Sequence, residues 1–341
     1  MVIAITIVAI LLFLGFAGAY HAPSVGNPND GGDVSMYRRT IDDMRQGKDY
    51  YAAAQQELLA GHYGMQSVFN WRTPALTSFL AWFPNLLWPQ ALFIAITVAA
   101  AALACKMMSL DIGRFGLYAA IAIEVLCLAL CAPPGSIVLS EIPTGVLILL
   151  SASAYGIGQL KLGFGAGVLA LFVRELAAPY ALVCAFLAWR ERRYGELAAW
   201  LAAFVCYLAY FLWHYHMVQL HLRPADSADP AGWLQFGGPA FVLSTASFNG
   251  LFLVAPMWVS ALLLPLGYLG LLAWPRPAGR RIALAVTAYL VIFAVVGKPY
   301  DNYWGALYTP LLSLGLIWAP AAVRDLWNCL RSPAENVAIA T

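Results

Sequence analysis

The residues best suited to acid–base chemistry lie early in the chain, in the glycine-hinged segment Asp30-Gly31-Gly32-Asp33. Asp33 precedes an amphipathic pattern, so its carboxylate either caps a helix, a contribution of about 1 kcal/mol, or acts as a general base at a helix start. Asp30 is either a turn residue or a second carboxylate for a metal ion or an acceptor hydroxyl. Asp33 is therefore the first candidate catalytic residue and Asp30 the second.

Two further charged segments interrupt apolar runs. Glu141, in Ser140-Glu141-Ile142-Pro143, is either an acid favoured by a helix dipole or a third catalytic candidate that orients an acceptor or a metal ion. Arg174 and Glu175 either form an ion pair with no chemistry, or Arg174 binds a phosphate, a task that suits its planar guanidinium.

The last polar segment is Lys298-Pro299-Tyr300-Asp301-Asn302-Tyr303-Trp304. Aromatic residues often form a belt at a membrane interface, whereas Lys298, Tyr300 and Asn302 could contact a phosphorylated headgroup. Arg72, before Thr73-Pro74, is either an interfacial residue or a contact of a lid over a site. Glu124 lies inside an apolar run and is either a proton relay or a hydrogen-bonded structural acid.

The composition is that of a polytopic membrane protein. Of 341 residues, 62% are hydrophobic and only 11% are charged, against about 25% charged in soluble domains. The net charge of +2 gives no reason to expect a nucleic-acid partner. The six cysteines include no CxxC pair, so they are expected to be small core residues rather than zinc ligands or disulfides.

Ten apolar runs predict an all-α bundle of about 10 transmembrane helices, since about 20 apolar residues span a bilayer. They form one domain, 1–331, with a first outer loop at 21–89 and a flexible cytoplasmic tail at 332–341. Within the loop, 34–45 and 49–60 are expected to be surface-lying helices, and 74–84 an interfacial helix too short to cross. The runs are 1–20, 90–108, 115–131, 143–160, 162–173, 176–189, 197–220, 251–273, 282–297 and 305–322.

Basic residues predict the orientation. With the N-terminus inside, the inner segments hold eleven Lys and Arg residues and the short outer segments hold three, as the positive-inside rule requires. Both termini are then cytoplasmic, and the polar segments described above share the outer face. The inner set is Lys106, Arg114, Lys161, Arg190, Arg192, Arg193, Arg276, Arg280, Arg281, Arg324 and Arg331.

This layout resembles the GT-C superfamily of membrane glycosyltransferases, small bacterial members in particular. The resemblance is sharpest in GGDVSMYRRTIDDMRQGKDYY, NWRTPALTSFLAWFP, LSEIPTGVLILL, LFVRELAAPYALV and KPYDNYWGALYTPLL. It implies a bundle in the bacterial inner membrane with a periplasmic active site. It also implies a polyprenyl-phosphate-linked sugar donor and a glycan or lipid acceptor, for synthesis of an envelope glycan or glycolipid.

The resemblance also implies roles for individual residues. The family's catalytic aspartate falls on Asp33, with Asp30 as the alternative, and the acid of the second outer loop falls on Glu141. The basic residue that meets the donor phosphate falls on Arg174. The polar positions of the last loop fall on Lys298, Tyr300 and Asn302.

One departure from the family concerns metal. The spacing Asp30-Gly-Gly-Asp33 is not a compact Asp-x-Asp pair, so dependence on a divalent cation is left open. Asp30, Asp33 and Glu141 are the ligands if there is one.

The expected reaction is an inverting sugar transfer. Asp33 takes the acceptor proton, Arg174 and Lys298 stabilise the leaving phosphate, and Arg72 closes the site. The main alternative is a transporter or flippase of a lipid-linked sugar intermediate, which requires a polar path through the bundle. A third reading is a non-catalytic assembly scaffold, which leaves the outer polar residues without a role.

Overall fold

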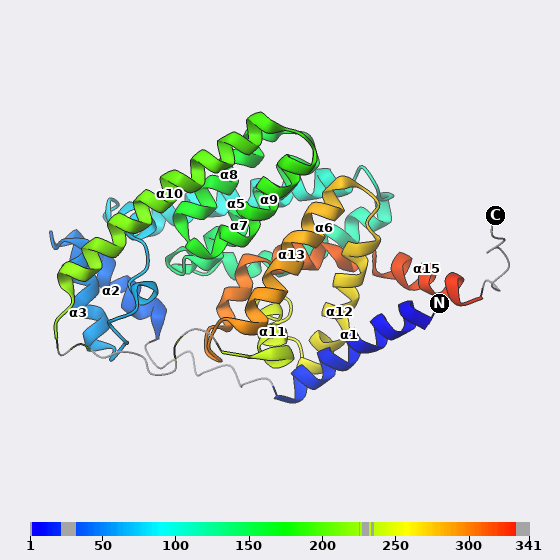
Figure 1. Cartoon of the computed structure of the whole chain (residues 1–341), viewed down its shortest axis with the longest axis horizontal. Coiled ribbons are helices and arrows are strands. Elements are labelled where there is room, and N and C mark those ends of the chain that lie inside the picture. Colours follow the sequence, from blue (N-terminus) through cyan, green and yellow to red (C-terminus); the bar gives the residue numbers. More distant parts are fainter. Residues whose placement is uncertain (1, 22–31, 225, 227–231, 233–234, 332–341) are drawn as a thin grey trace, which may run out of the picture.

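The computed structural model describes the whole chain except residues 1, 22–31, 225, 227–231, 233–234 and 332–341. The described residues form helices joined by turns and loops, with no strand among them (Figure 1). The predicted all-α class is therefore confirmed. Asp30 and the predicted cytoplasmic tail lie outside the described residues.

Four described helices are long and apolar enough to cross a membrane: α5 (Leu87–Met108), α6 (Arg114–Leu128, continued by η2 at Ala129–Cys131), α10 (Tyr194–His221) and α13 (Pro277–Val295). Two shorter helices, α8 (Leu160–Val173) and α12 (Met257–Ala273), are also apolar. These lengths support a membrane protein, but they do not support the predicted count of about ten spans.

Helix α7 (Glu141–Gly156) forms the centre of the bundle, and 14 of its 16 residues are buried. It packs against α5, α8 and α13, and Figure 1 shows it among these helices. A helix that is apolar on every side is stable only when it is covered on every side. The α7 helix therefore forms the core, and Glu141 is its first residue.

The last predicted span, 305–322, is not one helix. It is divided into η5 (Asn302–Leu307), α14 (Thr309–Leu314), η6 (Gly315–Ile317) and the start of α15 (Ala319–Arg331). Pro310 and Pro320 are the second residues of α14 and α15, and proline in the first turn favours a new helix because it lacks the N–H that would continue the preceding one. At η6 the backbone meets α12 so closely that a Cβ on Gly270 would lie 1.9 Å from the Gly315 oxygen. Small residues permit such approaches in membrane bundles.

The remaining helices complete the bundle. The short η4 (Glu175–Ala177) leads into α9 (Ala178–Arg190), which packs against α10 and α13. The first helix, α1 (Val2–His21), packs against α11 (Gly238–Ala246) and α12. The short η3 (Ser136–Val138) precedes α7.

The segments predicted at 34–45, 49–60 and 74–84 are confirmed as helices α2 (Asp33–Arg45), α3 (Tyr50–Ala60) and α4 (Pro74–Ala81). Gly47 has φ +95° just after α2, a conformation that favours glycine and ends the helix. Asp49 caps α3 by accepting the backbone N–H of Tyr51 at 2.9 Å. A small hydrophobic core joins this layer to the end of α10 through Tyr51, Trp71 and Val218.

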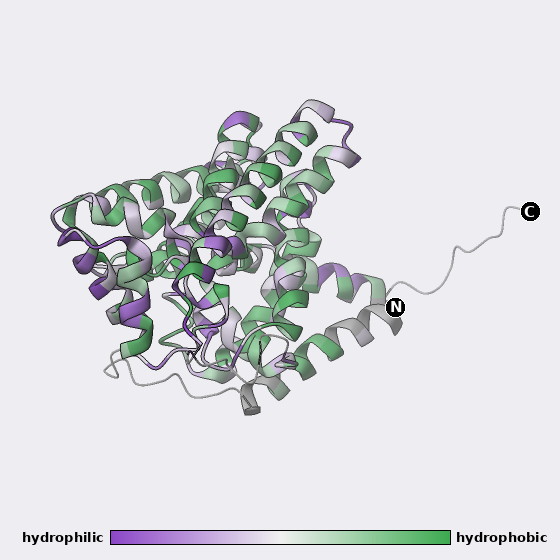
Figure 2. Ribbon diagram, turned by 60° about the vertical axis from the view of Figure 1, so that its left-hand side comes forward, coloured by the Kyte–Doolittle hydropathy of each residue, from purple (hydrophilic) through white to green (hydrophobic). Residues whose placement is uncertain are grey.

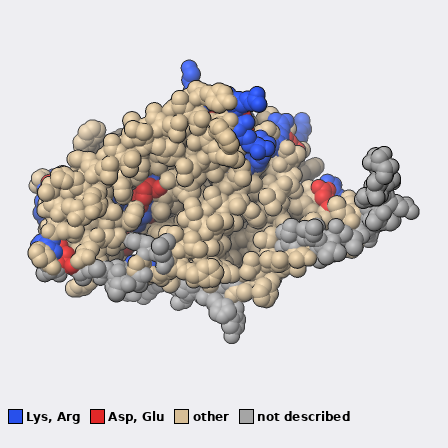
Figure 3. Space-filling view, in the orientation of Figure 1, with Lys and Arg blue, Asp and Glu red and all other residues tan. Residues whose placement is uncertain are grey.

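Polar residues collect at the two ends of the helices, with apolar segments between them (Figure 2). At the end away from α2 and α3, Lys and Arg gather over the ends of α9, α10 and α13 (Figure 3). Glu191 pairs there with Arg193 at 2.9 Å and with Arg280 at 3.3 Å. The predicted inner arginines of this region thus share one end of the molecule, while the compartment that each end faces stays a prediction.

Candidate functional site

A polar cavity of about 260 Å³ opens at the end of the molecule formed by α2 and α3. It lies between the start of α2, the segment 61–72 with η1 (Val68–Asn70), and the segment 298–303. Its lining residues are Asp33, Met36, Tyr37, Gly61, His62, Tyr63, Gly64, Phe69, Asn70, Arg72, Lys298, Tyr300, Asp301 and Tyr303. The first outer loop and the last polar segment therefore meet in one site, as the predicted topology requires.

Asp33 is held by two phenols rather than by the helix that it begins. Tyr63 donates its hydroxyl to Oδ1 at 2.6 Å, and Tyr303 donates to Oδ2 at 2.8 Å. The N-cap position belongs to Gly32, and no side chain caps α2. The N-cap interpretation of Asp33 is thus wrong. Burial raises the pKa of both tyrosines, so they remain protonated donors and hold the carboxylate in a fixed orientation.

Arg72 lines the cavity and connects its polar groups. Its Nε donates to the Tyr37 hydroxyl at 2.6 Å, and its Nη2 donates to the Tyr303 hydroxyl at 3.0 Å. Its Nη1 lies 2.9 Å from Glu141 Oε1. The backbone of Arg72 has φ +53°, uncommon for a residue other than glycine. Tyr50 braces this backbone by donating its hydroxyl to the Arg72 carbonyl at 2.9 Å.

Glu141 and Arg174 lie beneath Arg72 and outside the cavity lining. Glu141 is fully buried, and its Oε1 accepts from Arg174 Nε at 2.9 Å and forms an ion pair with Arg72. Arg174 also pairs with Glu175. Burial raises the pKa of the Glu141 carboxyl, and the charge of Arg72 acts against that rise. The result is a continuous chain of polar contacts from Asp33 through Tyr303, Arg72 and Glu141 to Arg174.

The last polar segment supplies a lysine and a second acid to the cavity. Asp301 Oδ2 accepts the Lys298 backbone N–H at 3.0 Å, and the Asp301 N–H donates back to the Lys298 carbonyl at 2.8 Å. Burial raises the pKa of Asp301 to about 6. The Lys298 ammonium lies 5.8 Å from the centre of the Tyr300 ring, and burial lowers its pKa. Tyr300 itself is 67% exposed at the rim.

The structure therefore divides the predicted site residues into three groups. Asp33, Arg72, Lys298 and Tyr300 line the cavity. Glu141 and Arg174 are outside the lining and contact the cavity through Arg72. A direct contact of Arg174 with a donor phosphate stays a prediction, and the ion pairs of Arg174 with Glu141 and Glu175 do not favour it. Asn302 begins η5 and is not among the lining residues.

Sequence reasoning did not assign site roles to Tyr37, Tyr63, Asp301 and Tyr303. Tyr37 is part of the apolar stripe of α2, where an aromatic residue is expected to pack into the core. The sequence offers one sign for Tyr63, which stands between glycines in Gly61-His62-Tyr63-Gly64. Gly61 and Gly64 also line the cavity.

The described residues contain no group of three or more His, Cys, Asp or Glu side chains that could hold a metal ion. Arg72 and Tyr303 stand between Asp33 and Glu141, so these two acids do not face a common point. A divalent cation at this site therefore stays a prediction that depends on Asp30.

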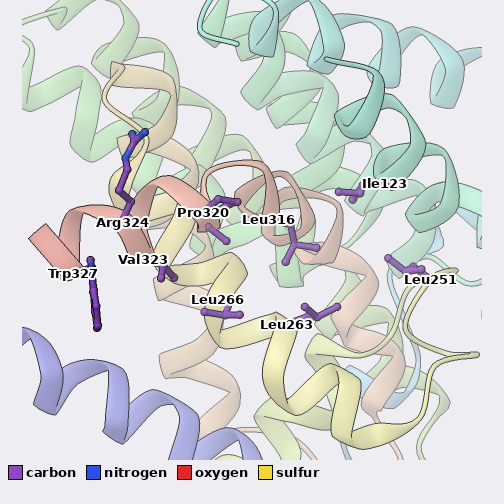
Figure 4. Close-up of a pocket in the computed structure, with 10 residues that line it drawn as sticks. Ile123, Leu251, Leu263, Leu266, Leu316, Pro320, Val323, Arg324 and Trp327 are labelled. Atoms are coloured by element: carbon purple, nitrogen blue, oxygen red, sulfur yellow. The ribbon is translucent and has the colours of Figure 1, made fainter. Parts of the chain in front are cut away.

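A larger groove of about 780 Å³ has a different character. Figure 4 shows it bordered by Leu263 and Leu266 of α12, Ile123 of α6, and Arg324 and Trp327 of α15. Apart from Arg324, the side chains that line it are apolar. The groove thus offers no acid–base chemistry, and the polar cavity at Asp33 is the better candidate for a reaction.

Comparisons with family models, with curated proteins and with solved structures found no match to this chain.

Proposed function

We propose that this chain is a membrane glycosyltransferase of the GT-C type, in the bacterial inner membrane. It moves a sugar from a polyprenyl-phosphate donor to the hydroxyl of a glycan or lipid acceptor at the periplasmic face. The observation that carries the proposal is that one cavity holds an oriented carboxylate, Asp33, and a guanidinium, Arg72, joined by the Tyr303 hydroxyl. In sugar transfer from a lipid phosphate, a base can take the proton of the acceptor hydroxyl and a cation can stabilise the leaving phosphate.

Asp33 acts as the general base in this proposal. Its carboxylate takes the proton of the acceptor hydroxyl while the acceptor oxygen forms a bond to the anomeric carbon. The bond from that carbon to the phosphate oxygen breaks, and its electron pair leaves with the phosphate, so the configuration inverts. A positioned base typically contributes about 10²–10⁴-fold to such a rate.

Arg72 and Lys298 stabilise the leaving phosphate. The guanidinium has five N–H donors, and the contacts to Tyr37, Glu141 and Tyr303 leave part of this set for an anion. Cations already in place where charge develops stabilise a transition state strongly, because nothing needs to reorganise. Glu141 is a positioning residue, and Arg174 neutralises it from the other side.

The test is a transfer assay with a matched pair of variants. Asp33→Asn should lower the rate about 10²–10⁴-fold while the protein still folds. Asp42→Asn is the control, because Asp42 lies on the same helix, is 59% exposed and pairs only with Arg45 among the described residues. Mass spectrometry of envelope glycans and polyprenyl-linked sugars, with and without each variant, measures the transfer. Normal transfer by Asp33→Asn would refute the assignment of the base.

A transporter of a lipid-linked sugar is the second candidate, favoured by one observation. Glu124 of α6 is fully buried, and its Oε2 lies 3.5 Å from the Ser313 hydroxyl. A buried acid within a membrane bundle often marks a transport path. Sealed vesicles separate the two functions, because a transporter moves the intact intermediate across the bilayer, whereas a transferase changes its mass.

A further inference from the structure

A second polar cavity, of about 400 Å³, opens at the end of the molecule away from Asp33. It lies where α7 ends, α8 and α13 begin, and the turn after α9 returns to α10. We call it the arginine cavity. Its ionisable and aromatic lining consists of Tyr155, Glu191, Arg193, Arg276 and Arg281. The proposed transfer reaction uses none of these residues.

Arg281 is the residue that sets this cavity apart. It is 6% exposed, and its guanidinium lies 4.0 Å from the centre of the Tyr155 ring. Its Nη1 contacts Cys184 Sγ at 3.3 Å. Among the described residues it forms no ion pair with a carboxylate. A buried cation is costly unless an anion compensates it. An anion bound next to this guanidinium would therefore be stabilised.

The other arginines of the cavity are already neutralised. Arg276 pairs with Asp111, and its Nη2 donates to the Leu110 carbonyl at 3.1 Å. Arg193 pairs with Glu191 at 2.9 Å and also with Glu196. The uncompensated positive charge of the cavity therefore comes from Arg281, so an anionic ligand would bind at that side chain.

The chemistry of the wall indicates where an anion would come from. Leu160 lines the cavity at the start of α8 and is 44% exposed, and Leu162 beyond it is 41% exposed. Exposed leucines at the start of α8 thus stand next to a basic cavity. Basic pockets between membrane helices suit phosphorylated lipid headgroups, with the acyl chain lying along the apolar surface.

We propose that the arginine cavity binds a phosphate group, and that an anionic phospholipid headgroup supplies it. The planar guanidinium of Arg281 donates two parallel hydrogen bonds to the phosphate oxygens, and the Tyr155 ring supports it from behind. This binding is independent of the reaction proposed at Asp33.

The test counts bound lipid on the purified full-length chain by native mass spectrometry. The chain is taken from nanodiscs of phosphatidylcholine that contain phosphatidylglycerol. Wild type should retain phosphatidylglycerol in preference to phosphatidylcholine, and Arg281→Gln should weaken this retention roughly 10- to 100-fold, the effect of losing hydrogen bonds to a charged group. Arg324→Gln is the control, because that side chain is 71% exposed on α15 and lies away from the cavity.

A second variant keeps the proposal testable if Arg281→Gln does not fold. Arg281→Lys keeps the charge but loses the fork, so it should also bind phosphatidylglycerol more weakly than wild type. A parallel titration with inorganic phosphate, followed by the melting temperature, distinguishes the source. Stabilisation by phosphate that depends on Arg281, without selective lipid retention, would support the phosphate site and overturn the lipid source. Equal binding of both probes by wild type and the Arg281 variants would overturn the whole proposal.

Discussion

The ion pair between Arg72 and Glu141 allows a quantitative test of how the site is held together. Arg72→Gln removes a guanidinium whose side chain is 10% exposed and leaves Glu141, which is fully buried, with Arg174 as its remaining cation. Glu141→Gln removes the carboxylate and leaves both arginines close together with only Glu175 to compensate them. Each single change therefore leaves a buried charge poorly paired.

The expected cost of Arg72→Gln follows from the contacts that it removes. Breaking a buried pair costs about 3–5 kcal/mol, and the lower end applies because Arg174 still bonds the same carboxylate oxygen. The lost hydrogen bonds to Tyr37 and Tyr303 add about 0.5–1.5 kcal/mol each. Arg72→Gln should therefore lower the free energy of unfolding by about 4–6 kcal/mol.

The double variant Arg72→Gln/Glu141→Gln removes both charges together. Its destabilisation should be smaller than the sum of the two single changes by about 2 kcal/mol, within the usual range for directly coupled residues. Unfolding of the purified protein in mixed micelles, followed by tryptophan fluorescence, measures all four free energies. Additive effects, with a coupling below about 0.5 kcal/mol, would refute the inference that the two charges stabilise one another.

Three further predictions follow from the described contacts. Tyr303→Phe removes the hydroxyl between the proposed base and the guanidinium, and should lower kcat for sugar transfer roughly tenfold. Asp301, with its pKa raised from 3.8 to about 6, stabilises the fold when protonated and loses this contribution as pH rises through 6. The melting temperature of wild type, relative to that of Asp301→Asn, should therefore fall between pH 4 and pH 6, and a flat difference would contradict the assignment. Gly270→Ala places a Cβ 1.9 Å from the Gly315 oxygen and should cost about 1–3 kcal/mol in the same unfolding assay, whereas Gly165→Ala, with open space around it, should not destabilise.

Local signals account for the elements that the sequence predicted well. The bounds of α2 and α3 follow from an amphipathic repeat, a capping Asp49, and glycines at 47 and 61, all within a few residues of the helix ends. The interruption of 305–322 coincides with Pro310 and Pro320, which are local signals, but the close approach of η6 to α12 has none. That contact joins residues far apart in the sequence, so hydropathy alone could not indicate it.

The candidate site also combines features that the sequence indicates with features that depend on contacts between distant residues. The pattern of basic residues predicted that Asp33 and Lys298 lie at the same end of the molecule, and both line one cavity. It could not show that Arg174 is 2% exposed and paired with Glu141 and Glu175. Whether an arginine faces a ligand or a neighbouring acid depends on how α7 meets η4 in space, and no local pattern reports this.

The burial of α7 has a consequence for how the protein is made. Ribosomes complete α7 long before α13 and α14, which cover it in the finished bundle. Until then, a helix that begins at Glu141 and carries Ser151 and Ser153 lacks part of its final cover. Helices α5 and α8, which lie close to α7 in the chain, are therefore the first to cover it. Arg72 is made before Glu141, so Arg174, which follows α8, is the partner that Glu141 gains last.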